Sequence, residues 1–110
     1  GVWKANTYPG CQCDVPSHLY SFSFAPYPEW SSTYAPQREI HDYLEKCADD
    51  FGLRPHLRFG VEVLGAEWSE PEQQWFVDTS EGPWTCRVLV SAVGAGLTWG
   101  SAYMTWTSRN

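Results

Sequence analysis

The spacing of apolar side chains is most regular in the middle of the chain. There they recur at the 3.6-residue period of an α-helix and form one apolar stripe. Pro36 suits the first helical turn, Glu39 favours the positive end of the helix dipole, and Gly52 suits the position after the last turn. The pattern predicts an amphipathic helix over about residues 36–51. The stripe consists of Ile40, Tyr43, Leu44, Cys47 and Phe51.

The second half of the chain carries three short runs with strand character. Residues 57–63 predict a strand with a continuation from Ala66, and the alternating run QQWFVDT predicts the next. Turn residues follow over 78–82. The run WTCRVLVSAVG ends in continuously apolar residues, which is typical of a strand buried on both faces of a parallel sheet. We therefore expect a small antiparallel β-meander and a final buried return strand over about 57–94.

Residues 1–35 show neither the 3.6-residue period of a helix nor the alternation of a strand. Prolines, Pro9 and Pro16 among them, and scattered serines interrupt the segment. Long structureless loops are usually functional or disordered, but disordered segments are poor in aromatic residues. This segment is rich in them, so it predicts a packed functional loop. Together the elements predict an α+β fold with a long aromatic N-terminal loop, one helix and a small meander.

Charge narrows the choice of partners. The 110 residues carry a net charge of −6, and their seven lysines and arginines do not cluster. Nucleic acid and anionic membranes are therefore poor partners. No run of 18 apolar residues is present, so the sequence predicts no membrane span.

The four cysteines, Cys11, Cys13, Cys47 and Cys86, permit two disulfides. Cys47 falls on the helix stripe and Cys86 in a strand, where small apolar side chains fit. This favours free buried thiols and a cytoplasmic location. Cys11, Cys13 and His18 supply only three ligands without the usual C-x2-C spacing, so we predict no metal site.

Four blocks of sequence, in order, carry a family resemblance. They are GVWKANTYPGCQCDVPSHLYSFSF, WSSTYAPQREIHDYLEKCADDFGLR, FGVEVLGAEW with WFVDT, and RVLVSAVG. Over residues 1–94 they resemble the class B flavoprotein monooxygenases, especially the Baeyer–Villiger type. The resemblance implies a partial FAD-binding domain of an α/β, Rossmann-like FAD/NAD(P)-binding fold, whose two GxGxxG fingerprints lie outside this stretch. Residues 95–110 match nothing in the family, and the glycines of GAGLTWG lack the spacing of a phosphate-binding loop.

The resemblance also implies roles for individual residues. Asp14 corresponds to a catalytic carboxylate that orients an arginine from another segment, so without that cation it is expected to be exposed to solvent. Tyr20 would close over the flavin, and the Tyr8–Gly10 turn would let the backbone approach the ring. The other implied cofactor contacts are Val2, Trp3, Lys4 and Ala5 with the flavin, Gln12 and Cys13 with NADP, and Val63, Ala92 and Gly94 with the FAD dinucleotide.

The implied activity is an FAD- and NADPH-dependent oxygenation. One oxygen of O2 would enter a ketone, or a soft nitrogen or sulfur would be oxygenated. The isolated chain, lacking both phosphate-binding fingerprints, is expected to be inactive. The alternative is a stand-alone tryptophan-rich module that binds carbohydrate or another small ligand, which would need several exposed coplanar tryptophans.

Overall fold

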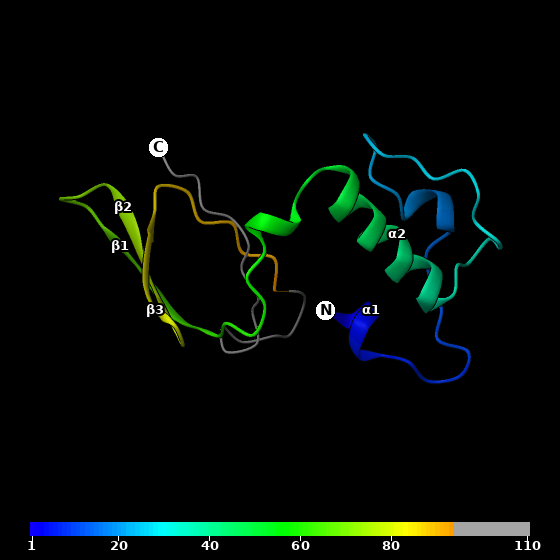
Figure 1. Ribbon diagram of the computed structural model, residues 1–110, viewed down its shortest axis with the longest axis horizontal. Helices are drawn as coiled ribbons and strands as arrows, with labels where there is room; N and C mark the ends of the chain where they lie inside the picture. The colour runs from blue at the N-terminus through cyan, green and yellow to red at the C-terminus, as the bar shows by residue number, and fades with distance from the viewer. Residues whose placement is uncertain (94–110) are drawn as a thin grey trace. The chain divides into compact units, whose positions relative to one another are not determined.

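The computed structural model describes residues 1–93, which fall into two compact units that divide after Arg54 (Figure 1). The first unit contains α1 (Val2–Ala5), the 3-10 turn η1 (Ser17–Leu19) and α2 (Gln37–Asp50). A second 3-10 turn, η2 (Arg54–His56), spans the division. The second unit contains the strands β1 (Val63–Ser69), β2 (Gln74–Thr79) and β3 (Gly82–Cys86).

Helix α2 is the centre of the first unit, and it lies within a residue of the predicted bounds at each end. The preceding loop supplies a partner for the first N–H of the helix, because the Gln37 N–H donates to the Cys11 carbonyl at 2.8 Å. After the helix, Gly52 adopts φ of +63°, and the Leu53 N–H returns to the Ala48 carbonyl at 2.8 Å. Glycine adopts this left-handed conformation after the last helical turn at low cost, because it has no Cβ.

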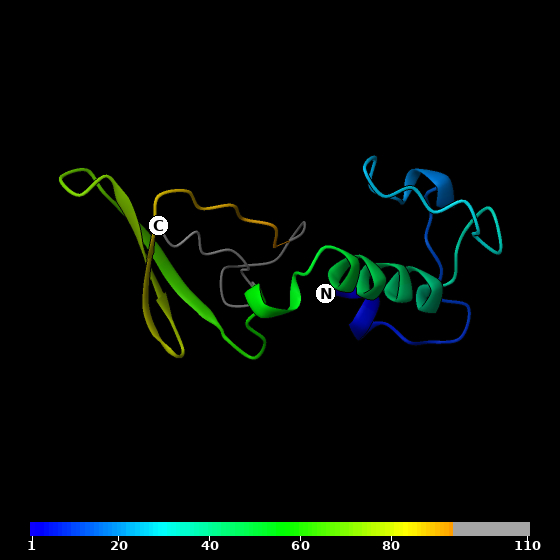
Figure 2. The same cartoon turned by 45° about the horizontal axis from the view of Figure 1, so that its top comes forward.

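The N-terminal loop, residues 6–35, packs against α2 and with α1 forms what we call the arm (Figure 2). Residues 11–13 run antiparallel to 35–37, and the Cys13 N–H donates to the Ala35 carbonyl at 3.0 Å. Cys13, Ala35 and Ile40 form the buried core of this unit, with Trp3, Tyr20 and Trp30 packed on it. The arm is mainly irregular, as predicted, but α1 and η1 interrupt it.

The second unit is a three-stranded antiparallel sheet in the order β1–β2–β3. Trp68 pairs with Trp75 and Trp75 with Cys86, and an irregularity lies between Val63 and Gly65 in β1. The predicted antiparallel meander is therefore present.

Two predicted strand segments are not formed. Residues 57–62 are not extended into a strand, because Gly60 adopts φ of +72° shortly after η2. The predicted buried return strand after Cys86 is also wrong for the described residues. Cys86 pairs with Trp75, the second residue of β2. Residues after Cys86 therefore extend past the beginning of β2, where the described part of the chain has no strand for them to pair with. Val88 and Val90 are consequently 70% and 73% exposed.

Candidate functional site

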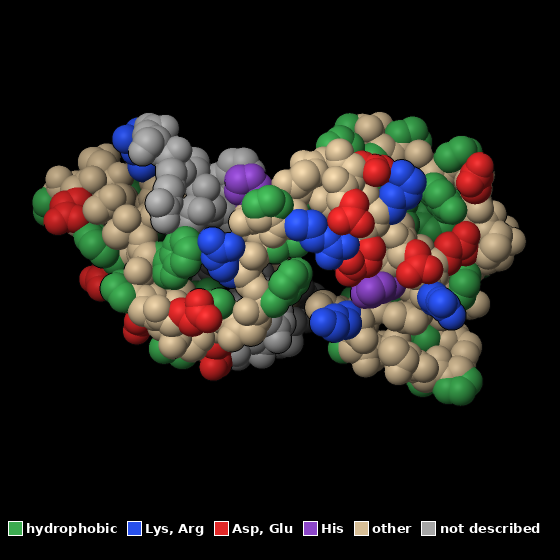
Figure 3. All heavy atoms as spheres, viewed as in Figure 1, with side chains coloured by type: hydrophobic (Ala, Val, Ile, Leu, Met, Phe, Trp, Pro, Cys, Tyr) green, Lys and Arg blue, Asp and Glu red, His purple; other side chains and the backbone are tan. Residues whose placement is uncertain are grey.

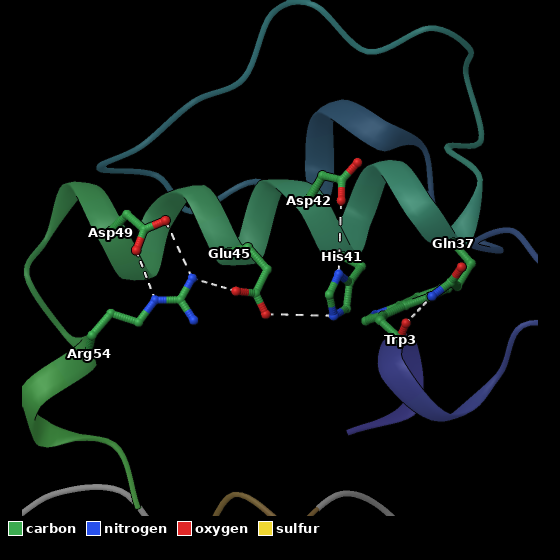
Figure 4. A network of polar contacts seen from close by, with 7 residues as sticks. All are labelled: Trp3, Gln37, His41, Asp42, Glu45, Asp49 and Arg54. Carbon is green, nitrogen blue, oxygen red and sulfur yellow. Dashed lines mark hydrogen bonds and ion pairs between the residues drawn. The ribbon is translucent and has the colours of Figure 1, made fainter. Parts of the chain in front are cut away.

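Three side chains of α2 hold three separate points of the arm. The Gln37 amide donates to the Trp3 carbonyl, as Figure 4 shows. The Glu39 carboxylate accepts from the Ser31 N–H at 2.9 Å and from its hydroxyl at 2.7 Å. The Tyr43 hydroxyl contacts the arm at residues 22–25. Helix α2 is the longest regular element of this unit, so these contacts fix three points of the arm to one defined surface.

Trp3 and Tyr20, two of the predicted flavin contacts, lie against each other. The Trp3 indole N–H donates to the Tyr20 hydroxyl at 2.8 Å, and the rings meet edge to face with centroids 5.5 Å apart. Both rings are half-buried on the core. Because the Tyr20 oxygen is the acceptor, the Tyr20 proton remains available to donate to a ligand. The pair forms a stiff aromatic corner.

The turn predicted over Tyr8–Gly10 is present. The Cys11 N–H donates to the Tyr8 carbonyl at 3.1 Å, Pro9 takes the second position, and Gly10 has φ of +79°. These are the requirements of a type II turn. A hydrogen bond with Cys11 raises the pKa of the Tyr8 phenol above its ordinary value. Tyr8 itself is exposed, so the turn presents an aromatic ring at the surface.

The residues predicted to contact NADP differ in their exposure. Gln12 is exposed, and so is the neighbouring Asp14, the predicted catalytic carboxylate, for which we expect solvent exposure. Cys13 is only 2% exposed, and its thiol donates to the Val15 carbonyl at 2.9 Å. Its side chain therefore belongs to the core, and only backbone atoms remain for a ligand.

The remaining predicted contacts are distributed over both units. Val2, Lys4 and Ala5 are exposed on or beside α1. Val63 is buried at the start of β1, opposite Thr79, and Ala92 is exposed beyond β3. Gly94 and the predicted tail 95–110 lie outside the described residues. The structure thus brings together Trp3 and Tyr20, and places the Gln12–Asp14 segment on the same unit.

Sequence reasoning missed the α2 residues that hold the arm. Tyr43 was assigned to the apolar stripe, where it is 5% exposed, and burial raises the pKa of its phenol. A tyrosine rather than a leucine at a buried position is the signal that could have revealed it, because a buried hydroxyl needs partners. Ser17 is similar: it is buried, and its hydroxyl contacts the carbonyls of Ser32 and Thr33 at 2.8 and 2.9 Å.

Charged side chains gather over α2 on the face seen in Figure 3. Arg54 bridges Glu45 and Asp49, and His41 lies 3.6 Å from Glu45 (Figure 4). The hydrogen bond from Arg54 lowers the pKa of Asp49. These groups are well exposed, so their ion pairs contribute little to the stability of the fold. They join the last turns of α2 to Arg54, the first residue of η2.

Two observations on the described part of the chain concern the rival kinds of site. Residues 1–93 contain no cluster of three or more histidine, cysteine or acidic side chains able to hold a metal. Trp68 and Trp75, which pair across β1 and β2, have ring centroids 5.7 Å apart and ring planes inclined by 60°. This pair is not coplanar, whereas the carbohydrate-binding alternative would need several exposed coplanar tryptophans. None of the helices described here is both long and apolar enough to cross a bilayer.

Comparison with known proteins finds relatives that match most of this chain, including the arm and the motif blocks. No protein-family model matches the chain. A Baeyer–Villiger monooxygenase of Streptomyces coelicolor is 56% identical over 94 residues, covering 86% of this chain and 18% of that protein. The crystal structure of OTEMO in complex with FAD and NADP superposes with a TM-score of 0.76 at 37% identity, over 86% of this chain and 19% of the other. An open crystal structure of cyclohexanone monooxygenase gives 0.72 at 41% identity, over 79% and 18%.

The fold and the arm are therefore those of a flavoprotein monooxygenase segment. Within that class the chain belongs with the Baeyer–Villiger type, which confirms the resemblance carried by the four blocks. The chain spans about a fifth of the length of the relatives it matches.

Proposed function

We propose that this chain is part of the flavin-binding half of an FAD- and NADPH-dependent monooxygenase. Its reaction would insert one oxygen of O2 into a ketone, or oxygenate a soft nitrogen or sulfur. The observation that carries the proposal is the 56% identity over 94 residues with a Baeyer–Villiger monooxygenase. The similar structures titled as an FAD and NADP complex and as a cyclohexanone monooxygenase support the cofactors and a ketone substrate.

The arm suits a large planar ring. The Trp3–Tyr20 corner is rigid, because one hydrogen bond and an edge-to-face contact hold the two rings together. Exposed apolar surface lies next to it in sequence at Val2, and the type II turn exposes Tyr8. Such an apolar surface can pack on a flavin, and Lys4, whose side chain is exposed, would contribute its backbone. We assign the flavin contacts to Val2, Trp3, Lys4, Ala5 and Tyr20.

The segment Gln12–Asp14 is our proposed approach to NADP. Gln12 would contribute its exposed amide, and Cys13 its backbone only, because its thiol is buried. Asp14 would orient an arginine from another part of the protein, and its exposure leaves the carboxylate able to form that ion pair. Val63, Ala92 and Gly94 would lie along the FAD dinucleotide.

When bound, FAD supplies the redox and oxygen chemistry. The residues of this chain bind and orient the ring, and their apolar side chains exclude water from one side of it. We further propose that residues 1–94 form a partial FAD-binding domain, that the isolated chain is inactive, and that the protein works in the cytoplasm, where its thiols stay reduced.

A chimera tests the proposal. Residues 1–94 would replace the matching segment of the Streptomyces coelicolor enzyme, and the purified protein would be assayed for bound flavin and for ketone-dependent NADPH consumption. We expect a yellow protein that consumes NADPH. In the same chimera Asp14→Ala should retain flavin and lose most activity, whereas Glu72→Ala, in the exposed β1–β2 turn, should change neither. A folded chimera without flavin would contradict the proposal.

A further inference from the structure

The hydroxyl of Tyr43 makes two hydrogen bonds to one turn of the arm. It accepts from the Phe22 N–H at 2.9 Å and donates to the Ala25 carbonyl at 2.6 Å. The same turn is closed by its own bond, from the Ala25 N–H to the Phe22 carbonyl at 2.9 Å. A hydroxyl carries one proton, so both the direction and the partners of these bonds are fixed.

From this arrangement, and resting on the function proposed above, we propose that Tyr43 is a positioning residue of the monooxygenase: its hydroxyl fixes the 22–25 turn, and through it the Tyr20 ring that faces the cofactor.

Packing alone does not account for a tyrosine at this position. The neighbouring stripe positions Ile40 and Cys47 are buried apolar residues, and a phenylalanine ring would fill the same space as the ring of Tyr43. The Tyr43 ring lies at the centre of an aromatic group, 5.4 Å from Trp30, 5.8 Å from Tyr27 and 6.1 Å from Phe22 between centroids. The hydroxyl is what distinguishes it, and the turn is what the hydroxyl binds.

The turn is connected to Tyr20 over a short and restrained stretch of backbone. The Tyr20 N–H donates to the Ser17 carbonyl at 2.9 Å, which fixes the near side. The Trp30 indole N–H donates to the Ser21 hydroxyl at 3.3 Å, and the Tyr43 bond to Phe22 fixes the far side. The direction of the Tyr20 side chain is therefore set between two anchored points.

Removing the hydroxyl releases two backbone groups at once. The Phe22 N–H and one acceptor site of the Ala25 carbonyl would lose their partner in a partly buried place. Such groups seek new partners, because leaving them unpaired is unfavourable. The turn would then shift, and the Tyr20–Trp3 corner would lose its exact orientation toward the flavin. Small displacements of positioning groups can reduce rates strongly while leaving binding intact.

The test uses the flavin-loaded chimera with Tyr43→Phe and a matched control, Tyr34→Phe. Tyr34 lies on the same arm and is 44% exposed, and no hydrogen bond of its hydroxyl is found within residues 1–93. For Tyr43→Phe we expect full flavin content, a kcat about tenfold lower, a ketone KM within about twofold, and a changed flavin fluorescence yield. Tyr34→Phe should match the unsubstituted chimera in all four.

If Tyr43→Phe and Tyr34→Phe give the same kcat and flavin fluorescence, the inference is wrong. Should Tyr43→Phe fail to fold, Ala25→Gly decides the question. It loosens the turn without touching the hydroxyl and should lower kcat in the same direction, and an unchanged kcat overturns the inference. An unsubstituted chimera that folds without flavin instead contradicts the proposed function, so the two failures are distinct.

Discussion

Ile40 offers the sharpest test of how the arm and α2 hold together. Its side chain is fully buried at the point where Cys13 and Ala35 of the arm meet the helix. Ile40→Ala removes about three buried carbon groups, which at about 0.8 kcal/mol each amounts to about 2.4 kcal/mol. A cavity that does not close adds to this, so we expect a loss of about 3 to 4 kcal/mol.

Leu44→Ala is the matched control, because Leu44 lies one turn further along α2 and is 37% exposed. It should cost about 1 kcal/mol, since much of its surface already contacts water. The assay is urea unfolding of the chain, followed by near-ultraviolet circular dichroism of the arm aromatics and by tryptophan fluorescence. Equal midpoints for the two variants would refute the packing of the arm on α2 described above.

Two further predictions concern titration and thiol reactivity. Because Arg54 lowers the pKa of Asp49, the small contribution of this exposed pair to stability is complete above the ordinary aspartate pKa, and it is lost as pH falls through the lowered value. Arg54→Gln should return the Asp49 pKa toward its ordinary value in a carboxyl NMR titration, and an unmoved pKa would disprove the pairing. Burial raises the pKa of the Cys86 thiol, but Cys11, Cys13 and Cys47 are more buried. Iodoacetamide should therefore label Cys86 first in the folded chain, at a rate that rises steeply with pH, and mass spectrometry showing Cys13 labelled equally fast would count against the described core.

The sequence predicted the elements that depend on local patterns. Helix α2 follows from a 3.6-residue period and from Gly52, both of which act within the segment itself. Strand β2 follows from alternation in the same way. The apolar run after Cys86 shows the limit of this reasoning, because a strand buried on both faces needs neighbouring strands. The described residues supply none beyond the end of β2.

The candidate site was predicted through motifs, and its geometry was not. Trp3 and Tyr20 are separated by 17 positions, so no spacing rule indicates that an indole N–H meets a phenol oxygen. Cys13 was expected to contact a cofactor, yet its side chain completes the core. The helical period predicts Tyr43 only as an apolar stripe residue, although its hydroxyl forms hydrogen bonds with the arm. Each of these contacts joins segments that are distant in sequence, which periodicity does not report.

The central claim is that the Trp3–Tyr20 corner contacts the flavin. Indole rings in contact with an isoalloxazine quench its fluorescence by electron transfer, so the flavin lifetime of the chimera reports that contact directly. Trp3→Phe should lengthen the lifetime, whereas Trp68→Phe, in the second unit, should leave it unchanged. Equal lifetimes in the unsubstituted and Trp3→Phe chimeras would contradict the claim.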